Sequence, residues 1–410
     1  MNVLPKGWVD TTLGEVCRVE YGKGLSANQR TESGAVPVVG SAGVIGRHSV
    51  SLVPGPVIVI GRKGNAGAIH LLRDACWPID TTYFVRVPPP FDPAFLAYQL
   101  RDAQLRSLDS STAVPSLRRP DLEACPLLVA PSRDQQRIVA VIEEQVSRLD
   151  TAEQLLRSAL QRCDVLYRSF MRTLEEWPLV PLADLLEKPL ANGRSVPTAE
   201  NGSGFPVLRL TALRNGFVDL SERKVGAWGR REAERYIVQE GDFLIARGNG
   251  SLALVGRGGL VTADPDAVAY PDTMIRARVD RKQMSPEFLR WVWNSSTVRR
   301  QIESAAKTTA GIHKVNQQDL GRVAVPFPPP EVQAAIVGDL ERQQSILQAL
   351  TKSIHQALSR SNQLRRSVLE GAFSGRLVPQ DPNDEPAPEL LARIASDHRK
   401  TAKPRRRQRA

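Results

Sequence analysis

The stretch RDQQRIVAVIEEQVSRLDTAEQLLRSALQRCDVLYRSFMRTLE, residues 133–175, has a second copy later in the same chain. When the sequence is shifted by 198 positions, Gln135 falls on Gln333 and Ile138 falls on Ile336. The match continues to the end of the stretch without an insertion or a deletion. Two long segments that share one register indicate a duplicated structural element.

Each copy is predicted to form one long helix with a coiled-coil seam. Apolar residues recur at alternating spacings of four and three, which keeps one stripe along one side of a helix and favours packing against another helix. About 40 residues at ~1.5 Å each make a rod of roughly 60 Å. An ordinary amphipathic core helix is the alternative. The seam positions are Ile138, Ile142, Gln145, Leu149, Leu156, Cys163 and Leu166 in the first copy and Ile336, Leu340, Gln343, Leu347, Leu350, Ile354, Ser361 and Leu364 in the second.

The two helices are predicted to pair antiparallel, and the polar residues of the seam suggest a register. An antiparallel crossing can place Gln145 opposite Ser361 and Gln343 opposite Cys163. A buried amide without a partner costs ~1–3 kcal/mol, so registers that set either glutamine against Leu or Ile are disfavoured. We therefore expect these polar pairs to define how the helices meet.

A globular segment precedes each helix, and these two halves also resemble each other. Short β-branched runs bounded by Gly and Pro predict strands at 57–60, 84–87, 243–246 and 274–279, and a helix is expected after Pro93 and after Pro286. The expected fold class is α+β: two globular domains of mixed α/β structure, separated by two long antiparallel helices that form a coiled coil, with a pseudo-two-fold internal duplication. The expected domains are residues 1–116, 117–177 (first helix region), 178–314, 315–377 (second helix region) and 378–410 (tail).

Composition is that of a soluble globular protein, with 41% hydrophobic and 24% charged residues among 410. Four scattered cysteines without a Cys-x-x-Cys pair favour reduced thiols over a zinc site or a disulfide framework. The first residues lack a signal-peptide pattern and no apolar run approaches a membrane span, so a cytoplasmic location is expected.

The net charge of +11 is concentrated at the C-terminus. Residues 393–410 contain eight Lys or Arg and one Asp, a net of +7. The rest of the chain is therefore only weakly basic. A Pro-rich and then Arg-rich composition predicts that residues 378–410 are disordered.

Motifs for catalysis are missing from the sequence. Residues 248–253 fit the dinucleotide-binding pattern G-x-G-x-x-A, but the Gly-rich continuation at 256–259 does not suit the helix that this pattern requires. Gly22-Lys23-Gly24 lacks the remaining residues of a phosphate-binding loop. No Asn-Pro-Pro-Tyr-like motif for adenine methylation and no paired histidines are present. Any chemistry is therefore expected to belong to a partner.

Polar loops recur at equivalent places in both globular halves and suit DNA. Arginine can bond guanine O6 and N7, asparagine can bond adenine N6 and N7, and glycine lets the backbone approach a phosphate. Ordinary solvated turns are the alternative reading for each single residue. The candidate DNA-binding residues are Lys23, Asn28, Arg30, Arg62, Lys63, Asn65, Ser111 and Thr112 in the first half and Arg209, Arg214, Arg247, Asn249, Lys307, Thr308, His313 and Lys314 in the second.

Several short motifs, in this order and duplicated about two helices, resemble the DNA-specificity subunit of Type I restriction–modification systems. They are GDFLIARG at 241–248, the run from Asp319-Leu320 through PPPEVQAAIV at 328–337, its counterpart from Asp121-Leu122 to QQRIV at 135–139, and LEGAFSGRL at 369–377. The resemblance covers the chain except for the basic tail. In the first half, GRKG at 61–64 stands where an acid-led strand and loop are commoner in the family.

This resemblance implies that each half is a target-recognition domain, which reads one part of a split, asymmetric DNA sequence, and that the helices set the distance between the parts. It also implies two partner modification (methyltransferase) subunits, which two ATP-dependent restriction subunits can join. S-adenosylmethionine, ATP and Mg²⁺ are expected on those partners and no cofactor, metal or catalytic residue in this chain. Two alternatives remain: a DNA-modifying enzyme with an unrecognised site, and a structural adaptor that holds proteins through its coiled coil.

Overall fold

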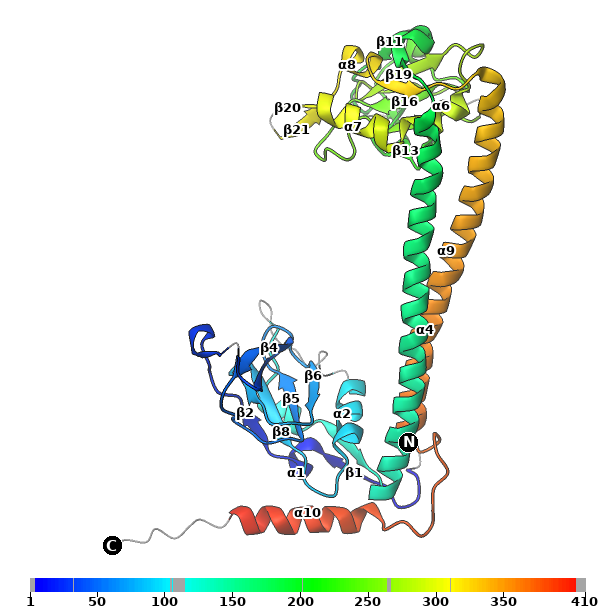
Figure 1. The fold of residues 1–410 in the computed structure, drawn as a ribbon. Coiled ribbons are helices and arrows are strands. Elements are labelled where there is room, and N and C mark those ends of the chain that lie inside the picture. Colours follow the sequence, from blue (N-terminus) through cyan, green and yellow to red (C-terminus); the bar gives the residue numbers. More distant parts are fainter. Residues whose placement is uncertain are drawn as a thin grey trace. The chain divides into compact units, whose positions relative to one another are not determined.

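The computed structural model describes residues 4–31, 33–103, 105, 115–200, 202–263, 267–309 and 311–402. The chain divides into two compact units (Figure 1). Unit 1 consists of Met1–Leu156 and Gln356–Ala410, and unit 2 consists of Arg157–His355. The division falls inside both long helices, α4 (Ser132–Thr173) and α9 (Pro330–Phe373). The predicted domain boundaries stay a prediction, because this division follows compactness and not the alternation of globular and helical segments.

Unit 1 contains three small sheets. Strands in the order β2-β8-β5-β6 form the central sheet, β4-β3-β7 form the second, and β1-β9 form the third. The short helices of the unit are η1 (Ala27–Gln29), α1 (Leu13–Val16), α2 (Pro93–Asp102) and α3 (Arg119–Glu123). Its strands are β1 (Val9–Thr12), β2 (Val19–Tyr21), β3 (Val36–Gly40), β4 (Gly43–His48), β5 (Val57–Gly61), β6 (Ile69–Leu72), β7 (Trp77–Pro78), β8 (Thr82–Arg86) and β9 (Pro126–Val129).

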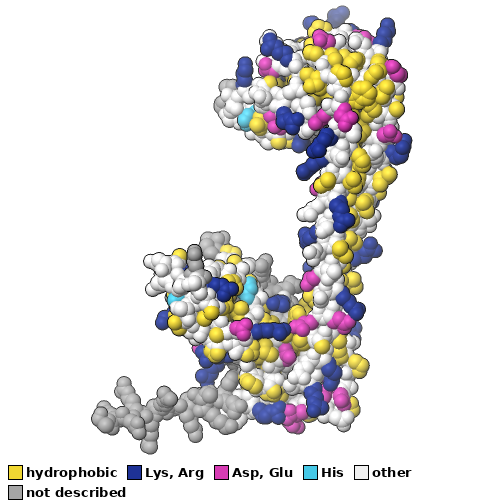
Figure 2. All heavy atoms as spheres, viewed as in Figure 1, with side chains coloured by type: hydrophobic (Ala, Val, Ile, Leu, Met, Phe, Trp, Pro, Cys, Tyr) yellow, Lys and Arg dark blue, Asp and Glu magenta, His cyan; other side chains and the backbone are white. Residues whose placement is uncertain are grey.

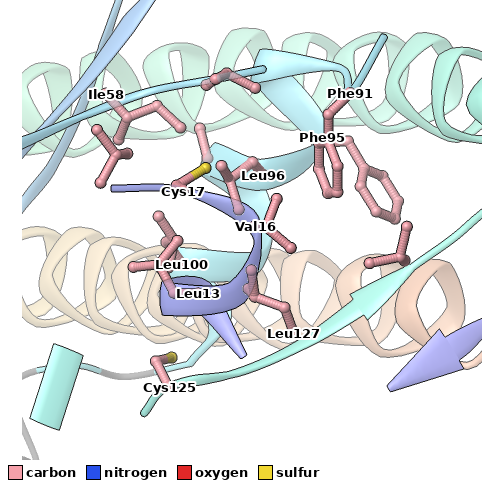
Figure 3. Packing of buried hydrophobic residues seen from close by; sticks show 14 of the residues in the cluster. Leu13, Val16, Cys17, Ile58, Phe91, Phe95, Leu96, Leu100, Cys125 and Leu127 are labelled. Atoms are coloured by element: carbon pink, nitrogen blue, oxygen red, sulfur yellow. The ribbon is translucent and has the colours of Figure 1, made fainter. Parts of the chain in front are cut away.

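The core of unit 1 lies between the central sheet, helix α2 and the long helices. Figure 3 shows Phe95, Leu96 and Leu100 of α2 among Leu13 and Ile58, and all five side chains are fully buried. Burial of apolar surface on this scale is the main source of stability for such a domain. The four cysteines of the chain are all buried and free, and burial raises the pKa of the Cys17 thiol to about 12.

Unit 2 repeats this plan with a larger central sheet. Six strands run in the order β11-β19-β16-β18-β14-β13, and β12-β15, β10-β22 and β17-β21-β20 form three smaller sheets. Its shorter helices are η3 (Leu174–Glu176), η4 (Leu182–Leu185), η5 (Leu210–Ala212), α5 (Arg230–Ala233), η6 (Glu234–Tyr236), α6 (Pro286–Trp293), α7 (Ser296–Ala305) and α8 (Gln317–Gly321). Its strands are β10 (Leu179–Pro181), β11 (Leu186–Asn192), β12 (Phe205–Leu208), β13 (Leu213–Arg214), β14 (Phe217–Val218), β15 (Arg223–Gly226), β16 (Phe243–Ala246), β17 (Gly248–Asn249), β18 (Gly258–Leu260), β19 (Met274–Val279), β20 (Lys307–Thr309), β21 (Ile312–Lys314) and β22 (Ala324–Pro326).

The internal duplication is visible strand by strand. The order β2-β8-β5-β6 in unit 1 matches β11-β19-β16-β18 in unit 2, and every neighbouring pair in both is antiparallel. The predicted strands at 57–60, 243–246 and 274–279 are confirmed, and the one at 84–87 begins two residues earlier, in β8. The α+β class with two globular halves and two long helices is therefore confirmed.

Helices α2 and α6 begin at Pro93 and Pro286, as the sequence predicted. Proline suits the first helical position because its missing N–H would have no partner there. The preceding residue caps each helix: Asp92 Oδ1 accepts from Ala94 N at 2.8 Å, and Ser285 Oγ accepts from Phe288 N at 3.0 Å. Each cap satisfies a backbone donor that the helix itself cannot pair.

A buried glutamine ties each of these helix caps to a long helix. In unit 1, Gln135 Oε1 accepts from Asp92 N at 2.8 Å and Gln135 Nε2 donates to Ala130 O at 2.7 Å. In unit 2, Gln333 Oε1 accepts from Ser285 N at 2.8 Å, and Gln333 Nε2 donates to Pro328 O at 3.1 Å and to Gln283 O at 2.8 Å. Both glutamines are fully buried.

The long helices pair antiparallel within each unit. In unit 1, Ile138 and Ile142 at the start of α4 share a core with Val368 and Phe373 at the end of α9. In unit 2, Phe170 and Met171 at the end of α4 pack with Val337 and Leu340 at the start of α9.

Part of the predicted seam is wrong. Ile142, Cys163, Leu340, Ile354 and Ser361 are buried, but Leu166, Leu350 and Leu364 are exposed by 46%, 45% and 54%. The side chain that follows Leu364, that of Arg365, is only 25% exposed and pairs with Asp150 at 2.5 Å. This ion pair directs the side chain of Arg365 toward α4. At this point of α9, the residue that faces α4 is therefore Arg365 and not the predicted seam residue Leu364.

The predicted register is also wrong in unit 1. Ser361 does not pair with Gln145: its hydroxyl donates to Glu153 Oε1 at 3.1 Å, eight positions further along α4. Eight helical residues correspond to ~12 Å. Glu153 also lies 3.4 Å from Arg365, so a carboxylate with two donors replaces the expected amide. In unit 2, Gln343 Oε1 is buried without a hydrogen-bond partner among the described residues.

The prediction of a disordered tail is wrong for residues 387–402, which form helix α10 (Ala387–Ala402). Ala387, Leu390 and Ile394 are buried in the core of unit 1, and Ala387 N donates to Gly7 O at 2.8 Å. Their spacing of three and four residues gives the helix one apolar face, which overrides the polar composition of the segment. Residues 403–410 lie outside the described part of the chain.

A buried arginine links α6 to α9 inside unit 2. Arg290 is 5% exposed, and its guanidinium carbon lies 4.4 Å from the ring centre of Phe217 and 4.6 Å from that of Trp291. Arg290 Nη2 pairs with Glu341 Oε1 at 3.0 Å. Burial lowers the pKa of Arg290, and Glu341 offsets part of that cost.

Candidate nucleic-acid interface

The polar loops predicted in the second half meet in one small sheet. Strand β21 is the middle strand: Asn249 of β17 pairs with His313, and Thr308 of β20 pairs with His313 from the other side. Lys314 lies between Gly248 and Lys307 in the same way. Two segments about 60 residues apart in sequence thus form a single surface.

Positive charge dominates this sheet. Lys307 and Lys314 are exposed and Arg247 is half-buried, and no carboxylate forms an ion pair with any of the three among the described residues. Thr308 Oγ1 and His313 Nδ1 lie 3.0 Å apart, within hydrogen-bonding distance. Figure 2 shows a histidine and several Lys or Arg side chains around this end of unit 2. Such a surface attracts phosphate groups.

The loop that follows Asn249 is held by side chains from α6 and α7. Arg299 Nη1 donates to Val255 O at 2.8 Å, and Trp293 Nε1 donates to Gly256 O at 2.9 Å. Asn249 Oδ1 accepts from Ser251 N at 3.0 Å, which leaves the Asn249 amide group as a donor. The loop is therefore presented by rigid elements.

In unit 1, Arg62 directly follows β5, and its backbone is bonded on both sides. Arg62 N donates to Thr81 O at 2.9 Å, and Arg62 O accepts from Leu117 N at 2.9 Å. The next residue, Lys63, forms an antiparallel bridge with Ser116. The Gly-rich loop of the first half therefore pairs with the segment that follows residue 114.

In unit 2, Arg247 directly follows β16 and makes the same two bonds. Arg247 N donates to Thr273 O at 2.8 Å, and Arg247 O accepts from Val315 N at 2.9 Å. The two arginines thus occupy one backbone frame that is present in both halves, as the duplication predicted.

Two aromatic rings lie beside Arg62. Its guanidinium carbon lies 5.3 Å from the ring centre of Tyr21 and 5.9 Å from that of Tyr83. Arg119 lies 6.0 Å from Tyr21 and pairs with Glu123 at 2.7 Å. Of the two rings, only that of Tyr21 is exposed, and basic side chains beside an exposed ring are typical of nucleic-acid surfaces.

The sequence predictions missed Tyr21 and Arg119. Tyr21 is 51% exposed and stands next to Gly22-Lys23-Gly24, which was the available signal. Its neighbour Tyr83 is anchored because its hydroxyl donates to Leu117 O at 3.1 Å. Burial raises the pKa of Tyr83 to about 12, so this hydroxyl stays protonated.

Three of the remaining candidates are bonded to other groups of the protein. The Arg30 guanidinium donates to two backbone carbonyls, and Arg214 pairs with Glu222 at 2.9 Å. Asn28 accepts from the Ser26 hydroxyl. Lys23, Lys63 and Arg209 are exposed and Asn65 is half-buried, whereas Ser111 and Thr112 lie outside the described residues. All of them stay predictions.

The described part of the chain contains neither a metal site nor a membrane span. No group of three or more His, Cys, Asp or Glu side chains is arranged to hold a metal ion. Within the same residues, no helix has the length and apolar character needed to cross a bilayer.

Comparisons with known proteins agree with this architecture. A family model described as "Type I restriction modification DNA specificity domain" matches residues 5–160 and 174–360. The chain is 34% identical over 192 residues to the Type I restriction enzyme EcoKI specificity subunit of Escherichia coli (strain K12), which covers 47% of this chain and 41% of that protein. It is 28% identical over 189 residues to the Type I restriction enzyme StySPI specificity subunit of Salmonella potsdam, and this match covers 46% of this chain and 41% of that protein. The matched part thus spans about two-fifths of the length of these relatives.

Solved structures share the fold at lower identity. The HsdS subunit from Thermoanaerobacter tengcongensis superposes with a TM-score of 0.56 at 20% identity, over 91% of this chain and 98% of that one. A chain from a study of complex assembly and conformational transition in the type I R-M system has a TM-score of 0.68 at 19% identity, over 92% and 100%.

Proposed function

Because the chain belongs to the family of Type I restriction modification DNA specificity domains, we propose that it reads a two-part, asymmetric DNA sequence, one part with each globular half. The observation that carries this proposal is the shared backbone frame of Arg62 and Arg247. An arginine on a fixed loop can form two hydrogen bonds to a guanine edge. Its presence in both halves is what a reader of two half-sites requires.

The long helices would act as the spacer between the half-sites. Each unit contains ends of both helices, and Gln135 or Gln333 attaches its globular half to them through buried hydrogen bonds. Such buried bonds hold a recognition surface in one orientation on its helix. The distance between the half-sites would then depend on helix length and register.

The proposal assigns the chemistry to other subunits. Two methyltransferase subunits, which bring S-adenosylmethionine, would dock on this chain, and two ATP- and Mg²⁺-dependent restriction subunits can join them. The chain itself would bind no cofactor and act in the cytoplasm. Calorimetry of the purified chain with S-adenosylmethionine, and separately with ATP, should give no stoichiometric heat. A clear binding heat for either ligand would count for an enzyme instead.

The decisive test maps methylated adenines across the host genome with and without this gene. A split, asymmetric motif should be methylated in the parent and unmethylated after deletion. Restoring the gene should restore methylation, and a copy with Arg230→Ala, an exposed position on α5, should do the same. Unchanged methylation after deletion would contradict the proposed function. Restoration by a chain that lacks one globular half would favour the adaptor reading.

A further inference from the structure

We infer that Tyr21 is a positioning residue for Arg62 and that the first half reads a guanine through this pair of a cation and a ring. The inference rests on the proposed function and adds to it the residue that orients the reading arginine and the base that is read. It is carried by the contacts around Arg62, which differ from those around Arg247 although the backbone frame is the same.

The backbone of Arg62 is held in place by hydrogen bonds on both sides. Hydrogen bonds to Thr81 O and from Leu117 N, both 2.9 Å, fix the residue on both sides. The backbone of the next two residues is also hydrogen-bonded: Lys63 N donates to Thr81 O at 3.2 Å, and Gly64 N donates to Pro115 O at 3.1 Å. The Cβ of Arg62 therefore has a defined direction.

Two neighbouring rings then lie on one side of the guanidinium. Tyr21 and Tyr83 lie opposite each other on the paired strands β2 and β8, with ring centres 5.0 Å apart and planes inclined by 58°. Their centres are 5.3 and 5.9 Å from the Arg62 guanidinium carbon. A cation placed in this way is attracted by the ring electrons, and its planar fork loses fewer rotamers when it bonds a base.

The hydrogen-bond donors of Arg62 remain open for a ligand. Among the described residues, its side chain donates to no acceptor and pairs with no carboxylate, whereas the nearby Arg119 is bonded to Glu123. A planar fork of unbonded N–H groups matches the paired acceptors O6 and N7 of guanine. Adenine presents one acceptor and one donor on the same edge and is a poorer match.

The second half serves as an internal comparison. In unit 1, strand pairing places Tyr83 opposite Ile60 on one side and Tyr21 on the other. In unit 2, the corresponding residue is Ile275, which lies opposite Ile245 on one side and Asn192 on the other. Ile275 and Asn192 thus replace the two rings, and Arg247 has no aromatic flank among the described residues. Orientation by a ring is a property of the first half.

The test uses the full chain, with its methyltransferase partners where these copurify, and the DNA motif found by genome mapping. Binding is measured to the cognate duplex and to duplexes changed at one base pair at a time. Arg62→Lys keeps the charge but removes the fork, and should reduce discrimination at one G·C pair by about 5- to 100-fold. Tyr21→Leu should reduce discrimination at the same pair by about two- to fivefold. Tyr21→Phe keeps the ring and should behave as the parent.

The outcomes separate the inference from the proposed function. Adding Tyr21→Leu to Arg62→Lys should cause no further loss, because the orienting ring acts only through the guanidinium. The role of Tyr21 would be overturned if Tyr21→Leu kept full discrimination at the G·C pair while Arg62→Lys lost it. Loss at an A·T pair would overturn the assignment of guanine. A parent chain that binds all duplexes equally would instead refute the proposed function.

Discussion

Gln135 and Gln333, which stand 198 positions apart, make the same buried hydrogen bonds in the two units of this protein. Each accepts from the backbone N–H of a helix-capping residue, Asp92 or Ser285, at 2.8 Å, and donates to a carbonyl five residues before itself. These bonds hold each globular half to the first turn of its long helix, and they account for the recurrence of glutamine in both copies.

The first prediction concerns these glutamines. Gln135→Ala should leave the Asp92 N–H without a partner, at a cost of ~1–3 kcal/mol, and Gln333→Ala should do the same to the Ser285 N–H. Hydrogen exchange should then become faster in α2 for the first variant and in α6 for the second. Gln136→Ala, at the exposed neighbouring position, is the matched control. Equal exchange in Gln135→Ala and Gln136→Ala would contradict the prediction.

The second prediction concerns the reading of DNA by the second half. Arg247→Ala should weaken binding to the cognate duplex by roughly 1–3 kcal/mol if the side chain contacts a base edge. The measurement compares cognate with random duplex at one salt concentration, because phosphate contacts depend strongly on salt. Equal losses on both duplexes would reduce Arg247 to a phosphate contact. Unchanged binding would remove it from the interface.

The third prediction is a pH dependence at the start of α7. Glu175 accepts from the Ser296 hydroxyl at 2.6 Å, and hydrogen bonds to Ser296 and Thr297 lower the pKa of Glu175 below its ordinary value. A lowered pKa in the folded state contributes stability above the unfolded pKa, and this stability is lost as the pH falls through the folded one.

Glu175→Gln should therefore lower the thermal midpoint of unit 2 at about pH 7 and have a smaller effect at about pH 3.5. Glu176→Gln, at the exposed position next to it, should have little effect at either pH. An effect of Glu175→Gln that does not depend on pH would indicate that packing, and not the carboxylate charge, is responsible.

The fourth prediction concerns the C-terminal helix. Leu390 of α10 is 1% exposed in the core of unit 1, so Leu390→Ala should destabilise that unit by ~2–5 kcal/mol. Chemical denaturation followed by hydrogen exchange can assign the loss to unit 1. The exposed neighbour Glu389→Ala should change stability little. Equal stability of both variants would show that α10 does not contribute to the core.

Local patterns predicted the elements of this fold well, because strands and helix starts depend on nearby residues. Pro93 and Pro286 mark the starts of α2 and α6, and the run 243–246 is the strand β16. The frame of Arg62 and Arg247 was also predictable, since duplication reports equivalence without any knowledge of contacts.

Contacts between distant segments were harder to predict. The apolar pattern identifies the inner face of α9 only to within one position, and the ion pair of Arg365 with Asp150 decides between Leu364 and its neighbour. The basic composition of the C-terminal segment led to a prediction of disorder, although residues 387–402 form helix α10 with one apolar face. Tyr21 lies in the candidate site because β2 pairs with β8, and the sequence patterns did not predict this strand pairing.

The unequal surroundings of Arg62 and Arg247 bear on the orientation in which a DNA site would be read. A duplicated frame with identical side chains would treat a DNA site and its reverse complement alike. With two tyrosines near Arg62 and with Asn192 and Ile275 at the matching positions of the other half, the two globular halves are chemically distinct. Under the proposed function, the protein distinguishes one DNA strand from the other, and a palindrome made from either half-site alone would be recognised by only one of the two halves.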